Sequence, residues 1–303
     1  MKIIDIHTHV YPEIRGISEG MYFASKGYGI CKHGNEDVQF LPPSFVKSNS
    51  PVEVHRAYMK WLGIDQALLM ANTLYGYYND YISESVKKYP DVYRGVAFVE
   101  PFRGEASVQE LAKVYEEGVL FGMKLEVNSC FACHMEEHMT GTLMAPFWDY
   151  LNSVGQPVFI HPFRPFDVAD ILQLAQQYKN INFIICHMGA EGNFGPHAQE
   201  NNFDFMINTV AHLDNVFLDT STVPYYVSKA DEEYPYPTTI AFLEKAYHKV
   251  GAEKMMWSSD YPGMLVMATY RQLIDLIVKN CKAIPAGDKE KIMGLNAYNM
   301  FFK

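Results

Sequence analysis

The chain of 303 residues lacks several features that would assign it to common protein classes. Its apolar runs stay below the roughly 18 residues of a membrane-spanning helix, so we expect no such span. Its start is not typical of a signal peptide, because Asp5 and His7 interrupt the apolar run at once. No internal repeat is visible, and no G-x-G-x-x-G follows a predicted strand, which argues against a dinucleotide-binding fold.

Positive charge and cysteine are also scarce. The formal net charge of −10 argues against a nucleic-acid or anionic-membrane surface and leaves small-molecule partners open. The five cysteines are odd in number and scattered, which indicates a reducing cytoplasm rather than a disulfide framework. Cys130, Cys133 and His134 form a C-x-x-C-H pattern. Haem attachment needs an exported chain, so we interpret this pattern as part of a barrel loop.

Hydrophobic residues make up 49% of the chain and charged residues 20%, as in a globular domain with a sizeable core. Apolar strands alternate with amphipathic helices along the sequence. The predicted strands lie within 1–9 and at 65–70, 93–99, 122–127, 157–161, 181–187, 216–219 and 254–258. The predicted helices lie at 52–62, 80–88, 106–117, 145–154, 167–178, 203–212, 238–250 and 268–279.

This alternation indicates a parallel sheet with both faces covered. Eight strand–helix units in this length predict one (β/α)8 TIM barrel over residues 1–303, with a doubly wound open sheet as the alternative. Residues 10–51 are rich in Gly, Pro, Ser and Tyr and look irregular. We interpret them as a lid-like insertion over the active-site mouth, and the alternative is a plain surface excursion.

Four of the 11 histidines end predicted strands. His7 and His9 are two residues apart on the first strand, so they point to the same side. His161 and His187 end later strands, and Asp260 follows the last one. In a barrel these ends converge on the face that carries the active site. Three histidines and one carboxylate suit Zn(II) with an activated water, and a further histidine can act as a general acid or base.

Four motifs carry a family resemblance: H-T-H at 7–9, F-I-H-P at 159–162, C-H-M-G at 186–189 and S-S-D-Y-P at 258–262. Together they resemble the amidohydrolase superfamily. More narrowly they resemble its amidohydrolase-related (type 2) branch, which includes aminocarboxymuconate-semialdehyde decarboxylase and related metal-dependent hydrolases. The resemblance runs over nearly the whole chain.

The resemblance implies a metal-dependent hydrolase that cleaves a C–N or C–O bond of a small carbonyl substrate. The alternative is a non-oxidative decarboxylase of a small unsaturated or aromatic carboxylic acid with the same metal site. The resemblance also implies a homodimer. It implies a catalytic acid or base, His187, beside a metal ion whose ligands are His7, His9, His161 and Asp260, with Asp260 also moving a proton.

The resemblance implies one divalent ion, Zn(II) or Mn(II). In two-metal members a carboxylated lysine bridges the ions from the end of strand 4, whereas Lys124 here is interpreted as a structural residue within the strand. Glu126 is a candidate for a second ion or for substrate contact. Arg164, just past His161, is the nearest cation for a substrate carboxylate, or else a surface ion pair. Asp219, which ends a strand, is a candidate partner for a ligating histidine.

Overall fold

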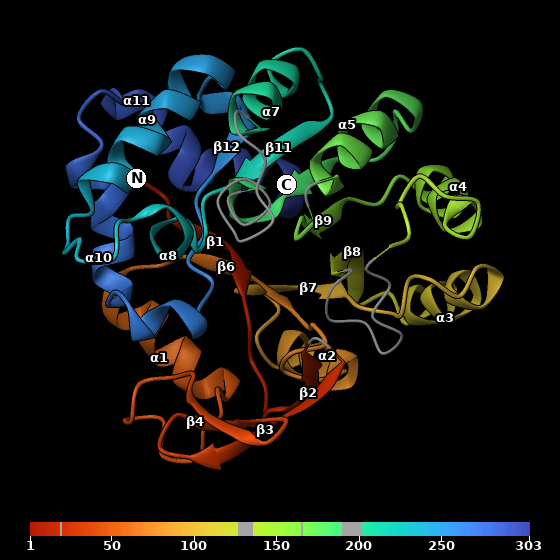
Figure 1. The fold of residues 1–303 in the computed structure, drawn as a ribbon, viewed down its shortest axis with the longest axis horizontal. Helices are drawn as coiled ribbons and strands as arrows, with labels where there is room; N and C mark the ends of the chain where they lie inside the picture. The colour runs from red at the N-terminus through yellow and green to blue at the C-terminus, as the bar shows by residue number, and fades with distance from the viewer. Residues whose placement is uncertain (19, 127–135, 165, 190–201) are drawn as a thin grey trace.

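The computed structural model describes residues 1–18, 20–126, 136–164, 166–189 and 202–303. Eight parallel strands form one sheet in their chain order, with helices between them (Figure 1). The sheet closes into a barrel because the backbone after the last strand bonds to the first: His9 N donates to Tyr261 O at 2.8 Å and Asp260 N to His7 O at 3.0 Å. The predicted (β/α)8 barrel is therefore confirmed.

The barrel strands are β1 (Ile4–Thr8), β6 (Gln66–Met70), β7 (Tyr93–Ala97), β8 (Leu120–Glu126), β9 (Val158–His161), β10 (Phe183–Ile185), β11 (Val216–Asp219) and β12 (Met255–Met256). The α-helices described are α1 (Val52–Leu62), α2 (Asn79–Lys88), α3 (Glu105–Glu116), α4 (Ala145–Val154), α5 (Asp167–Gln177), α7 (Asn202–Val210), α8 (Val223–Val227), α9 (Pro237–Val250), α10 (Tyr270–Asp275) and α11 (Ala286–Glu290). Shorter 3₁₀ or π segments are η1 (Cys186–Gly189), η2 (Ala252–Lys254), η3 (Gly263–Val266), η4 (Leu276–Asn280), η5 (Lys291–Leu295) and η6 (Tyr298–Phe302). None of the helices in the described ranges is both long and apolar enough to span a bilayer.

The helices follow from local sequence. In α1 the buried residues Val52, His55 and Met59 recur at helical spacing, and the helix ends at Gly63, whose φ of 73° suits glycine. The core of the barrel has two parts, and a third, separate cluster lies under the insertion. An outer layer packs helices on strands, and a smaller inner cluster fills the barrel. Aromatic residues of η6 close the end of the barrel opposite the site, where Phe301 packs on Phe159 and Phe121.

A bulge in β1 explains how both halves of this strand face the barrel interior. Strict alternation would put the isoleucines at 4 and 6 on one face and the histidines at 7 and 9 on the other. The pairing of β1 with β6 shifts register between Asp5 and Thr8. Ile4 and Ile6 therefore lie in the inner cluster, and His7 and His9 line the cavity above it.

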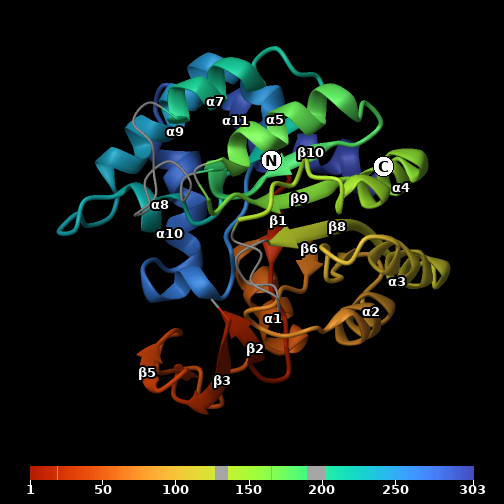
Figure 2. The ribbon, with the colours of Figure 1, turned by 45° about the vertical axis from the view of Figure 1, so that its right-hand side comes forward.

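The expectation of an irregular segment at 10–51 was wrong. Its middle forms a four-stranded antiparallel sheet of β2 (Arg15–Ser18), β3 (Met21–Gly27), β4 (Ile30–His33) and β5 (Glu36–Gln39), beside the barrel (Figure 2). These strands are partly exposed, so they lack the apolar runs that mark the barrel strands. Gly16 allows close docking on the loop after β6, because a Cβ there would lie 2.0 Å from Thr73 O.

Candidate metal and catalytic site

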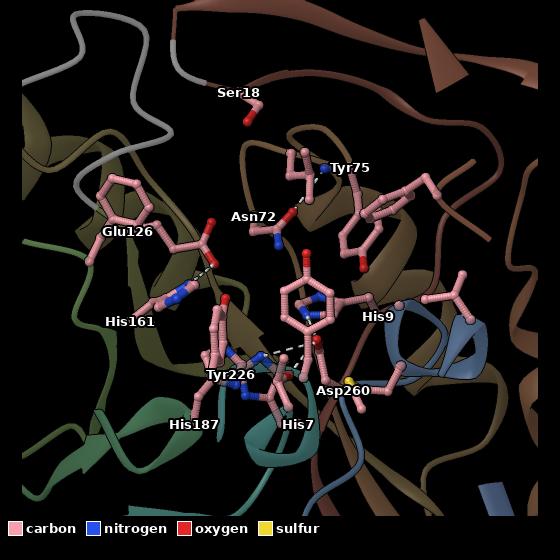
Figure 3. A pocket seen from close by; sticks show the side chains of 18 of the residues that line it. His7, His9, Ser18, Asn72, Tyr75, Glu126, His161, His187, Tyr226 and Asp260 are labelled. Atoms are coloured by element: carbon pink, nitrogen blue, oxygen red, sulfur yellow. Dashed lines mark hydrogen bonds and ion pairs between the residues drawn. The ribbon is translucent and has the colours of Figure 1, made fainter. Parts of the chain in front are cut away.

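One cavity of about 350 Å³ opens at the carboxyl ends of the barrel strands (Figure 3). The predicted residues His7, His9, His161, His187 and Asp260 all line it. The insertion adds Ser18, Gln39 and Phe40 to the lining. Further lining residues are Asn72, Leu74, Tyr75, Glu126, Phe163, Thr222, Tyr225, Tyr226, Gly263, Met264 and Val266. The barrel thus brings together predicted site residues that are up to 253 positions apart, from His7 to Asp260.

Three of the predicted ligands form a compact donor group. One donor atom from each of His7, His9 and Asp260 lies within 4.8 Å of the others. Asp260 Oδ1 is 3.2 Å from His9 Nε2 and 3.8 Å from His7 Nε2. Two imidazoles and a carboxylate at this spacing are a suitable partial shell for a divalent ion.

The hydrogen bonds behind the two histidines leave the Nε2 atoms for this role. His7 Nδ1 donates to Asp219 Oδ2 at 2.6 Å, and His9 Nδ1 donates to Met70 O at 2.9 Å. When Nδ1 carries the proton, Nε2 of the neutral ring keeps its lone pair. Both lone pairs therefore lie beside Asp260, which is the arrangement that an ion needs. The donor set fits a metal ion, and Asp219 is the hydrogen-bond partner of His7, one of the predicted ligands.

Asp219 also orients His187 through Ser221. The Ser221 hydroxyl donates to Asp219 Oδ1 and so accepts from His187 Nδ1, at 2.8 Å. His187 Nε2 is then unprotonated. Burial lowers the pKa of His187 well below its usual value, and the neighbouring imidazoles of His161 and His7 add to this shift. His187 is therefore a neutral imidazole in the cavity wall, with its ring centroid 4.9 Å from that of His7.

The backbone that presents these groups is strained. The sequence predicted that His187 ends a strand at 181–187, but β10 stops at Ile185 and His187 lies in η1 with φ 55°. Asp260 and Thr222 also have positive φ, 56° and 57°. Such conformations are costly for residues other than glycine and gather at functional sites. Thr222 Oγ1 donates to Asp260 Oδ2 at 2.8 Å, so Asp260 Oδ1 is the oxygen that faces the histidines.

His161 and Glu126 form the opposite side of the cavity (Figure 3). His161 is not part of the compact donor group among the described residues, so its role as a ligand stays a prediction. Its ring centroid is 4.4 Å from that of His187, and its Nδ1 is 3.8 Å from Glu126 Oε1. Burial raises the pKa of Glu126, but the charge of Lys124 and the contact with His161 outweigh this effect and lower it to about 2.

Lys124 lies closer to the donor group than its interpretation as a structural residue implied. It is fully buried in β8, with Nζ 3.5 Å from His7 Nε2, 3.4 Å from Glu126 Oε1 and 3.3 Å from Cys186 Sγ. Burial lowers the pKa of its amine, but the surrounding acidic groups raise it above the usual value. The ammonium therefore opposes a cation on His7 while it compensates the charge of Glu126.

Arg164 is placed away from the cavity. It is buried, its Nη2 lies 2.6 Å from Asp167 Oδ1, and it does not belong to the described lining. The structure therefore does not bring it to the other predicted site residues. Cys130, Cys133 and His134 lie outside the described residues.

Sequence reasoning missed Ser221, Thr222 and Tyr75. Tyr75 packs on His9, with ring centroids 4.7 Å apart, and stacks on Tyr11 of the insertion at 4.5 Å. Ser221 and Thr222 could have been predicted as site residues from the sequence. They belong to the polar run 219–222 at the end of an apolar strand, and strand ends carry the site in a barrel.

The family model described as Amidohydrolase (Amidohydro_2) matches residues 4–303, so the chain belongs to this family. The match confirms the resemblance inferred from the motifs and the prediction of an amidohydrolase-type enzyme. No curated protein matches the chain in sequence.

Solved structures similar to this chain include a probable 2-pyrone-4,6-dicarboxylic acid hydrolase from Acinetobacter baumannii with citric acid bound. It has a TM-score of 0.70 and 18% identity, and the match covers 99% of each chain. The 5-carboxyvanillate decarboxylase of Sphingomonas paucimobilis has a TM-score of 0.65 and 16% identity, with 99% of this chain and 98% of that chain covered. A dihydroxybenzoic acid decarboxylase from Polaromonas sp. with bound manganese has a TM-score of 0.59 and 19% identity, with 81% and 84% covered. At these identities the likeness shows the fold.

Proposed function

We propose that this protein is a metal-dependent hydrolase that cleaves a C–N or C–O bond of a small carbonyl compound. The observation that carries the proposal is the direction of two hydrogen bonds. His7 and His9 each give their Nδ1 proton to an acceptor behind the ring and keep Nε2 for an ion beside Asp260. An ion held there would lower the pKa of a bound water and polarise the substrate carbonyl.

The chain's own residues supply the proton transfers. His187 is neutral, and its Nδ1 proton is committed to Ser221, so its Nε2 can take a proton from the attacking water. Asp260 holds one oxygen on Thr222 and presents the other to the two histidines. In this proposal His161 completes the ligand set, and Glu126, which also lines the cavity, contacts the substrate.

Histidine-rich donors favour Zn(II), and Mn(II) is the second choice because a similar decarboxylase structure contains manganese. The three described cysteines, Cys31, Cys186 and Cys281, are free and buried, which supports a cytoplasmic location.

Decarboxylation with the same ion is the second candidate function. It is supported by the structural likeness to 5-carboxyvanillate and dihydroxybenzoic acid decarboxylases. Both reactions use an ion next to a neutral base, so the arrangement of these groups serves either one. Carbon dioxide release from carboxylated aromatics, measured beside the hydrolysis of aromatic lactones and esters, separates the two.

The test starts with the metal content of the purified protein and of His7→Ala, measured by plasma mass spectrometry. We expect about one divalent ion per wild-type chain. His7→Ala should lose most of this ion and the hydrolytic activity while the fold persists, because the barrel core does not depend on the ion. Circular dichroism checks the fold. Full metal content in His7→Ala would exclude His7 as a ligand, and an active protein without any ion would refute the proposal.

A further inference from the structure

Among the described residues, the lining of the cavity contains carboxylates and aromatic side chains but no Lys or Arg. Asp260 and Glu126 are its two carboxylates among the described residues. No Lys or Arg belongs to the described lining, and the sequence ranges 127–135 and 190–201 contain neither residue type. Aromatic walls come from five residues: Phe40, Tyr75, Phe163, Tyr225 and Tyr226.

The nearest cations are already committed. Lys124 lies below the cavity floor, fully buried, 3.4 Å from Glu126 Oε1. Arg164 is held by Asp167 and by Glu137 O, at 2.6 Å each. Neither is in the described lining, so neither forms a direct ion pair with a molecule bound there.

The charges around the site balance once an ion is bound. Asp260, Glu126 and Asp219 carry three negative charges, and Lys124 together with a divalent ion carries three positive ones. A carboxylate that enters such a site loses its hydration, and beyond the ion it finds no cation to replace that hydration. A second carboxylate on the same molecule would have no counter-charge at all.

The geometry points to an uncharged, flat-ring carbonyl compound as the substrate class, such as an aromatic amide, ester or lactone, with dicarboxylates excluded. This inference rests on the proposed hydrolysis. The aromatic walls match a ring, and Glu126 repels a second negative group while it can accept a hydrogen bond from a neutral one. The chain would then differ from the similar structure that is described as a dicarboxylic acid hydrolase and holds citric acid.

The experiment compares a neutral and a doubly charged aromatic carbonyl compound on the zinc-loaded protein. Isothermal titration calorimetry measures the Kd of benzamide and of benzene-1,3-dicarboxylate. We expect benzamide to bind at least tenfold more tightly. Glu126→Gln should tighten dicarboxylate binding about tenfold, because one repelling charge disappears and Lys124 loses its partner.

A matched pair of variants tests whether charge in the lining decides this preference. Val266→Lys adds a cation at a lining residue that is 47% exposed, at the end of η3. Val46→Lys adds the same charge at a residue that is 58% exposed and outside the described lining. We expect Val266→Lys to tighten dicarboxylate binding severalfold and to leave benzamide binding unchanged, and Val46→Lys to change neither.

The inference is overturned if the wild type binds the dicarboxylate as tightly as benzamide, or if benzamide does not bind at millimolar concentration. Hydrolysis of 3,4-dihydrocoumarin and of its carboxylated derivative is measured in the same samples. Selective benzamide binding without any hydrolysis would refute the proposed reaction and support the charge preference. Faster hydrolysis of the carboxylated lactone would support the reaction and refute the inference.

Discussion

Replacing Asp219 with asparagine should change which nitrogen of His7 carries the proton. Asp219 Oδ1 accepts from Ser221 N at 2.8 Å, from Ser258 Oγ at 2.8 Å, from His187 N at 3.2 Å and from the Ser221 hydroxyl. Asp219 Oδ2 accepts from His7 Nδ1 at 2.6 Å. In Asp219→Asn the amide oxygen will take the position with the larger number of donors, so the amide NH₂ will face His7.

The amide NH₂ of the new asparagine and a protonated Nδ1 of His7 are both donors and cannot hydrogen-bond to each other. His7 must therefore carry its proton on Nε2, where the proton blocks ion binding. Losing such a partner typically costs 10–100-fold in metal affinity. For Asp219→Asn we therefore expect a loss of about 1.4–2.7 kcal/mol in ion binding. Competition with a chromophoric chelator measures the affinity, and ¹⁵N-detected imidazole NMR reports the tautomer of His7.

Asp275→Asn is the control, because Asp275 is a buried carboxylate at the end of α10 that pairs with Lys279 at 2.8 Å, outside the described lining. It should leave the ion affinity unchanged. An Asp219→Asn variant that binds the ion within twofold of the wild type, with His7 still protonated on Nδ1, would refute the argument.

Three further predictions test other groups. His187→Asn should lower kcat/KM by about 10²–10⁴-fold and keep the ion, whereas Asp260→Asn should lose the ion. Metal analysis and kinetics test both variants, and the opposite pattern would mean that the two roles are reversed. Lys124→Met should keep one ion per chain and lower the free energy of unfolding by about 3–5 kcal/mol, because Glu126 loses its buried partner. Two ions per wild-type chain and one per variant chain would instead show a binuclear site. Burial lowers the pKa of His55 to about 3, so the unfolded chain takes up this proton below pH 6.5 before the folded chain does. The free energy of unfolding should then decrease as the pH is lowered. Urea titrations should show that its decrease between pH 6.5 and 4.5 is about 2 kcal/mol smaller in His55→Gln than in the wild type. Equal decreases in the two proteins would contradict the pKa shift.

The barrel could be predicted because its signals are local. The predicted helix at 52–62 coincides with α1, and the predicted strand at 216–219 coincides with β11. A buried parallel strand needs an apolar run, and a covering helix needs an apolar stripe, so both patterns are present in short windows of sequence.

Irregular and short elements were harder to predict. The strands of the insertion are partly exposed, and hydrogen bonds such as Ile17 N to Thr73 O tie this sheet to a distant loop. The predicted strand at 181–187 ran two residues too far, because the left-handed backbone of His187 depends on Asp219 accepting from its N–H. The predicted strand at 254–258 is reduced to Met255–Met256, and η2 takes Lys254 at its start.

The sequence by itself determined which residue types stand at the carboxyl ends of the strands, and a closed barrel brings such residues to one cavity whatever its details. Only the tertiary structure decided what each residue does there. Arg164 pairs with an aspartate three residues away and not with the cavity. The proton on His7 is fixed by Asp219, 212 residues along the chain. Which nitrogen can hold an ion is set by the partner of the other nitrogen, and that partner is chosen by the packing of β11 near β1, which no short window of sequence contains.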